Sequence, residues 1–126
     1  MKRILLVDDS RVTRELIKVY LIAKDVELEE APDGAEALRM IRTRPPDLVL
    51  ADLRMPRLDG FGLCQALQAD PRLRRVPVLI LTSNRDAGVE ERLRGAGALQ
   101  VLQKPIQPQP LLDAIQRHIL SPAVAS

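Results

Sequence analysis

Short apolar runs alternate with segments of helical periodicity along this chain. The apolar runs, each expected to form a strand, cover about 3–7, 26–31, 48–51, 76–81 and 99–102. The helical segments cover about 11–23, 35–42, 60–69, 87–95 and 109–120. Strands that alternate with helices form βα units, in which right-handed crossovers keep successive strands parallel. The pattern therefore predicts an α/β fold with a single doubly wound parallel sheet of five strands and helices on both faces.

The composition fits one domain of this kind. A chain of 126 residues, 46% of them hydrophobic, can bury one substantial core but not two. We expect a domain over residues 1–120 and a short C-terminal tail over 121–126. The formal net charge of +2 is too small to indicate direct nucleic-acid binding. Tyr20 and Phe61 lie far apart in the sequence, so they predict no surface for base stacking.

The N-terminus and the cysteine content bear on location. The apolar run that follows Met1 is too short for a signal peptide or a membrane span. Cys64 is the single cysteine, so it cannot form an intramolecular disulfide and fits a reducing compartment. We therefore expect a cytoplasmic protein without a membrane attachment.

The first predicted helix has a clear start and an apolar face. Ser10 precedes it and is a candidate N-terminal cap. Val12, Leu16, Val19 and Ala23 share one side of the helix at helical spacing. In the following run, 26–31, apolar residues alternate with glutamates, which is typical of a strand at the edge of a sheet.

Polar residues stand where four of the predicted strands end. Asp8 and Asp9 follow the first strand and Asp52 follows the third. Thr82 comes after the fourth strand and Lys104 after the fifth. In an open parallel sheet, ligands bind in the crevice outside the carboxyl ends of the strands. We therefore expect one crevice that collects these five side chains.

The residue types at this crevice favour magnesium and a phosphoryl group. Clustered carboxylates repel one another unless a cation compensates them, and magnesium prefers hard oxygen ligands. Lys104 and Thr82 could hold phosphoryl oxygens. The chain has no phosphate-cradling glycine loop, and its histidine, His118, lies on the last predicted helix. These features leave Asp52 as a nucleophile that accepts a phosphoryl group as an acyl phosphate.

The motifs around these residues carry a family resemblance. They are Leu5-Leu6-Val7-Asp8-Asp9-Ser10, Asp52-Leu53-Arg54-Met55-Pro56 with Asp59-Gly60, Leu81-Thr82-Ser83, and Lys104-Pro105. In this order and spacing the chain resembles response-regulator receiver domains of two-component signalling, and is similar to the chemotaxis regulators, from about Lys2 to Leu120. The resemblance implies a flavodoxin-like fold with strand order 2-1-3-4-5.

The resemblance also implies roles for the acidic residues. Asp52 is the expected phosphoacceptor. Asp9, Asp52 and the backbone carbonyl of Arg54 are the expected ligands of Mg²⁺, and Asp8 is expected to act mainly through a metal-bound water.

Three further positions match the family pattern and a fourth departs from it. The resemblance implies that Thr82 binds a phosphoryl oxygen, that Lys104 pairs with the phosphate, and that Pro105 follows a cis peptide. Family members usually carry an aromatic residue three positions before the lysine, whereas Val101 occupies that position here. We therefore expect the output to pass through the predicted helix 87–95, or the loop before it.

The implied function is that of a stand-alone receiver. A phosphohistidine on a sensor histidine kinase, or on a histidine phosphotransfer protein, would phosphorylate Asp52 in a Mg²⁺-dependent reaction. The phosphorylated domain would bind a protein target through the segments 87–95, 99–102 and 109–120, or relay its phosphoryl group, with a homodimer as a further option. It would not be an enzyme beyond catalysing its own phosphorylation and dephosphorylation.

Two other functions compete with this one. The first is a pseudo-receiver that binds partners without phosphorylation, against which the complete set of Asp8, Asp9, Asp52, Thr82 and Lys104 argues. The second is a magnesium-dependent phosphatase with an aspartyl nucleophile. Such an enzyme would need a second aspartate two residues after Asp52, where this chain has Arg54.

Overall fold

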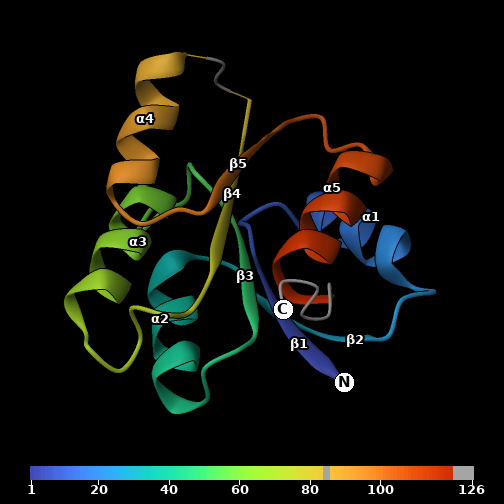
Figure 1. The fold of residues 1–126 in the computed structure, drawn as a ribbon, viewed down its shortest axis with the longest axis horizontal. Helices are drawn as coiled ribbons and strands as arrows, with labels where there is room; N and C mark the ends of the chain where they lie inside the picture. The colour runs from blue at the N-terminus through green and yellow to red at the C-terminus, as the bar shows by residue number, and fades with distance from the viewer. Residues whose placement is uncertain (84–85, 121–126) are drawn as a thin grey trace.

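The computed structural model describes residues 1–83 and 86–120 as a parallel sheet flanked by helices (Figure 1). The strands are β1 (Lys2–Val7), β2 (Val26–Ala31), β3 (Leu48–Asp52), β4 (Val78–Thr82) and β5 (Gln100–Gln103). They pair in parallel in the order β2-β1-β3-β4-β5. The predicted fold and strand order are therefore confirmed, and β2 lies at an edge as expected.

Helices cover both faces of the sheet. They are α1 (Arg11–Leu21), α2 (Gly34–Thr43), α3 (Gly60–Ala69), α4 (Ala87–Gly95) and α5 (Pro108–Ile115). Figure 1 shows α1 and α5 on one side of the sheet and α2, α3 and α4 on the other. The two buried apolar clusters divide in the same way, because one contains Ile17 and Leu111 and the other contains Ile41, Leu63 and Leu93.

The central strands are buried on both faces. Every residue of β3 and of β4 is buried, including the polar Asp52 and Thr82. Successive side chains point to opposite faces, so Leu48 and Leu50 join the α1 and α5 side while Val49 and Ala51 join the other. Burial on both faces explains why these strands have continuous apolar runs rather than alternating ones.

Polar side chains cap the helices that follow the first four strands, whereas α5 begins without a side-chain cap. The Ser10 hydroxyl accepts a hydrogen bond from the Thr13 amide at 3.3 Å, which confirms the predicted cap of α1. Asp33, Asp59 and Asp86 cap α2, α3 and α4 in the same way. The loops at the carboxyl edge of the sheet therefore end in defined helix starts.

The apolar residues that share one side of α1 face solvent rather than the core. Val12 and Val19 are 78% and 64% exposed, and Ile17 instead packs in the core. On the inner side of α1, Arg14 Nε and Lys18 Nζ lie 2.9 Å and 3.0 Å from the Glu30 carboxylate of β2. α1 is therefore oriented about its axis with Arg14 and Lys18 toward the edge strand and with its valines toward solvent.

The C-terminal helix also differs in detail from its predicted range of 109–120. The α-helix α5 ends at Ile115 and continues as a π-helical turn, Gln116–Leu120. The predicted tail, 121–126, lies outside the described residues. Within the part of the chain that the structure describes, none of the helices has the length and apolar character needed to cross a bilayer.

Cys64 should be a poorly reactive thiol. It is buried between α3 and the sheet, and this burial raises its pKa from 9.0 to about 12. We expect the native protein to react with a disulfide reagent at pH 8 at least about 1000-fold more slowly than the unfolded chain, because the thiolate is the reactive form. Absorbance stopped-flow with and without denaturant measures both rates. Equal rates would contradict the burial of this side chain.

Candidate functional site

The polar residues predicted at the strand ends meet in one place. Asp8 and Asp9 directly follow β1, and Asp52 is the last residue of β3. Asp8, Asp9 and Asp52 each offer one carboxylate oxygen such that all three atoms lie within 4.8 Å of one another. Lys104 Nζ lies 3.2 Å from Asp8 Oδ2 and 3.1 Å from Asp52 Oδ1. Four of the five expected side chains, those of Asp8, Asp9, Asp52 and Lys104, therefore meet at one edge of the sheet.

Negative charge exceeds positive charge among Asp8, Asp9, Asp52 and Lys104. Burial and the Asp8 carboxylate raise the pKa of Asp52, and the contact with Lys104 offsets only part of that effect. Burial lowers the pKa of Lys104, but the Asp8 and Asp52 carboxylates outweigh it and leave this pKa raised. The Lys104 ammonium thus pairs with two of three clustered carboxylates, and the excess negative charge favours a bound cation.

The three carboxylates differ in the partners they already have. Asp8 Oδ1 accepts a hydrogen bond from the Ser10 amide at 2.8 Å, and its Oδ2 contacts Lys104. Asp9 is exposed, and Asp52 lies at the rim of the sheet. The donor set consists of hard oxygen ligands at short mutual distances, which fits Mg²⁺.

Thr82 and Lys104 are held at the same edge by the sheet itself. Thr82 ends β4 and is buried. The Lys104 amide donates to the Thr82 carbonyl at 2.9 Å, so the ends of β4 and β5 remain paired beyond Gln103. The peptide between Lys104 and Pro105 is cis, as expected. Val101 is half-buried and packs against the cluster beneath α2, α3 and α4.

Sequence reasoning missed a residue behind the acidic loop. The Arg14 guanidinium of α1 donates to the Asp8 carbonyl oxygen and pairs with Glu30 of β2. It therefore connects the loop that carries Asp8 and Asp9 to the edge strand. The sequence around Arg14 does not indicate this role, because the contact depends on the orientation of α1 about its axis.

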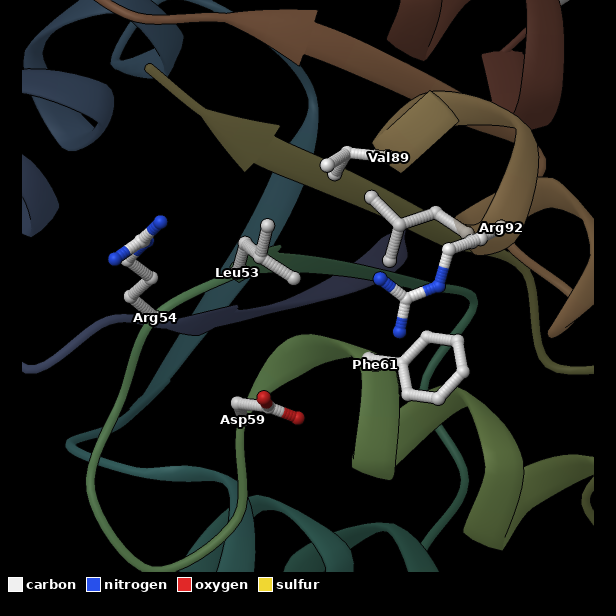
Figure 2. Close-up of a pocket in the computed structure, with 7 residues that line it drawn as sticks. Leu53, Arg54, Asp59, Phe61, Val89 and Arg92 are labelled. Carbon is white, nitrogen blue, oxygen red and sulfur yellow. The ribbon is translucent and has the colours of Figure 1, made fainter. Parts of the chain in front are cut away.

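A separate cleft lies beside the site, between the loop after β3 and α4 (Figure 2). Its volume is about 310 Å³. It is lined by Leu53, Arg54, Asp59, Phe61, Val89, Arg92 and Leu93. The Arg92 guanidinium carbon lies 5.1 Å from the centroid of the Phe61 ring. Figure 2 shows Arg54 directed away from this pair. The sequence did not predict this cleft, because it arises from the packing of α3 against α4.

Comparison with known proteins gives a consistent result. The sequence matches the family described as "Response regulator receiver domain" over residues 4–116. It is 30% identical over 118 residues to the polar-differentiation response regulator DivK of Brucella anthropi, covering 94% of this chain and 96% of DivK. The chain spans only 12 to 48% of the length of seven other curated relatives that it matches.

Solved structures show the same likeness. The chemotaxis protein CheY4 of Vibrio cholerae superposes with a TM-score of 0.87 at 31% identity, covering 94% of this chain and 99% of CheY4. The receiver domain of the sensor histidine kinase PA1611 of Pseudomonas aeruginosa gives a TM-score of 0.86 at 33% identity, covering 95% of this chain and 98% of that domain. The PA1611 structure has a magnesium ion coordinated in its active-site cleft.

Removing one carboxylate should stabilise the metal-free protein. In Asp52→Asn the repulsion from Asp8 and Asp9 is relieved, so we expect unfolding in EDTA to cost about 1 kcal/mol more than in the wild type. Added Mg²⁺ should stabilise the wild type and leave Asp52→Asn nearly unchanged. Urea denaturation in EDTA and in Mg²⁺ measures both effects. Asp25→Asn, at an exposed position, is the control, and a destabilised Asp52→Asn in EDTA would contradict the charge imbalance.

Proposed function

The chain belongs to the response regulator receiver domain family, and on that premise we propose that it is a signalling switch with Asp52 as its phosphoacceptor. One observation carries the proposal. Asp52 lies at the end of a fully buried strand, and its Oδ1 is 3.1 Å from Lys104 Nζ. The carboxylates of Asp8 and Asp9 are close enough to bind one metal ion together with Asp52. This arrangement supports transfer of a phosphoryl group to Asp52 and its stabilisation there.

The proposed chemistry is a displacement at phosphorus. An oxygen of Asp52 attacks the phosphorus of a phosphohistidine, the P–N bond breaks, and the imidazole leaves with the bonding electron pair. Lys104 pairs with the phosphoryl oxygens, and the Thr82 hydroxyl binds one of them. Hydrolysis of the acyl phosphate by water returns Asp52 to its carboxylate. Catalysis beyond these two self-directed steps is not part of the proposal.

Magnesium belongs to the same proposal. Asp9, Asp52 and the backbone carbonyl of Arg54 would bind it, with Asp8 acting through a metal-bound water, since both oxygens of Asp8 already have protein partners. The ion would supply positive charge to the phosphoryl oxygens. The PA1611 receiver domain, with magnesium in its cleft, supports this assignment.

The proposed partners use two different surfaces. A sensor histidine kinase or histidine phosphotransfer protein would approach Asp52 over α1, which begins two residues after Asp9 and exposes an apolar stripe. The stripe consists of Val12, Leu16, Val19 and Ile22. The protein target would bind the surface formed by α4, β5 and α5. A cytoplasmic location also stays a proposal, supported by the single cysteine.

Phosphorylation of Asp52 is the first test. The purified protein is incubated with phosphoramidate and Mg²⁺, and its intact mass is measured. We expect the wild type to gain one phosphoryl group, EDTA to prevent the gain, and Asp52→Asn to remain unmodified. An unmodified wild type, or equal labelling of Asp52→Asn, would sink the proposal and favour a phosphorylation-independent module.

Docking of the phosphodonor on α1 is the second test. Val19→Glu places a charge in the apolar stripe, so transfer from phosphorylated histidine phosphotransfer domains should slow by about tenfold, the effect of about 1.4 kcal/mol of lost binding. Labelling by phosphoramidate needs no docking and should be unchanged. Leu99→Glu, at an apolar residue 48% exposed before β5, is the matched control. Equal slowing by both variants would rule out α1 as the specific docking face.

A further inference from the structure

The turn between β2 and α2 contacts the loop that follows Asp52 through two adjacent residues. Asp33 Oδ2 lies 2.9 Å from Arg57 Nε and 2.8 Å from Arg57 Nη2. Gly34 packs directly on the backbone of Leu58, where a Cβ at residue 34 would overlap the Leu58 carbonyl oxygen and lie 2.8 Å from the carbonyl carbon. The loop 53–59 can occupy this position only because residue 34 has no side chain.

Arg57 adopts a backbone conformation that is unusual for an arginine. Its φ of 70° lies in the left-handed region, where glycine is strongly favoured over residues with a Cβ. Leu58 donates its amide to the Pro56 carbonyl at 2.8 Å, so the loop turns tightly around Arg57. From this backbone position the Arg57 side chain, which is 70% exposed, forms the ion pair with Asp33.

Asp33 is itself firmly placed. Its side chain is only 4% exposed, and its Oδ1 accepts a hydrogen bond from the Glu36 amide at 2.8 Å. That amide hydrogen bond and the Arg57 guanidinium lower the pKa of Asp33, so the carboxylate is ionised at neutral pH. Arg57 therefore pairs with a rigid anion rather than with a mobile surface group.

The same short segment also contacts the other half of the site. The Ala31 carbonyl, at the end of β2, accepts a hydrogen bond from the Asp8 amide at 3.2 Å. Residues 31–34 therefore touch the backbone that carries Asp8 and Asp9 at one end and the loop that follows Asp52 at the other. We call this segment the buttress.

We propose that the buttress sets the relative position of the two backbone segments that hold magnesium, and that Asp33 and Arg57 are positioning residues for this metal. Neither residue belongs to the proposed ligand set. The inference rests on the proposed function, because it concerns the same Mg²⁺ site. According to this inference, the placement of the magnesium ligands depends on the segment after the edge strand β2 as well as on the strands that carry the ligands.

The test compares the Mg²⁺ affinity of the wild type with that of two variants, measured by isothermal titration calorimetry of the whole chain. Asp33→Asn keeps a capping oxygen for α2 and removes the charge. Arg57→Gly removes the guanidinium and accepts the left-handed backbone without penalty. We expect the dissociation constant for Mg²⁺ to rise about tenfold in each, the lower end of the loss seen when groups that orient metal ligands are removed.

The control is Arg39→Ala, which deletes another ion pair of α2. Arg39 is about as exposed as Arg57, but its partner Glu36 is 38% exposed, whereas Asp33 is 4% exposed. Removal of Arg39 should leave the Mg²⁺ affinity unchanged. A second readout needs no metal: in EDTA, hydrogen exchange of the Leu58 and Gly60 amides should be faster in Asp33→Asn and Arg57→Gly than in the wild type and Arg39→Ala.

The outcomes separate the inference from the function on which it rests. If the wild type binds Mg²⁺ and both positioning variants bind it equally well, the buttress has no role in the metal site. The same conclusion follows if the variants only lower the thermal midpoint. If the wild type binds no Mg²⁺, the proposed function and the inference both fail.

Discussion

Asp8, Asp9 and Asp52 place three carboxylates within reach of one cation, and the surrounding structure has to offset this concentration of negative charge. Lys104 offsets part of it through contacts with Asp8 and Asp52. The Ser10 amide takes up the other oxygen of Asp8. An excess of negative charge remains at the site, and this excess is the physical basis of the proposed magnesium binding and phosphoryl transfer.

The backbone that carries these three carboxylates has to remain in place despite their mutual repulsion. β3 and β4 are buried on both faces, so the strand ends at Asp52 and Thr82 cannot move apart without opening the core. The edge strand β2 contributes from outside, since Glu30 pairs with Arg14 and Ala31 accepts from the Asp8 amide. The edge of the sheet thus supports the centre, although it carries none of the proposed ligands.

The proposal assigns the two partners of this receiver domain to different surfaces. The exposed apolar stripe on α1 follows the loop that carries Asp8 and Asp9, and it is the docking face proposed for the phosphodonor. The surface proposed for the protein target is formed by α4, β5 and α5, and Val101 of β5 packs beneath α4 instead of providing an aromatic group. A separation of this kind would let one partner deliver the phosphoryl group while another responds to it.

The sequence by itself determined the order of the elements, the strand order through the family resemblance, and the polar residues at the strand ends, of which Asp8, Asp9, Asp52 and Lys104 meet in the structure. These features follow from local periodicity and from the rule that parallel strands end at one edge, so Asp52, Thr82 and Lys104 could be found without coordinates. The rotation of α1 could not, because the helix carries two apolar stripes and its orientation is coupled to Glu30 on another strand. The Asp33 and Arg57 pair and the cleft at Phe61 and Arg92 were also decided only by the tertiary structure. Each of these contacts joins side chains from different βα units, and crossover packing, which local pattern does not encode, determines whether they meet.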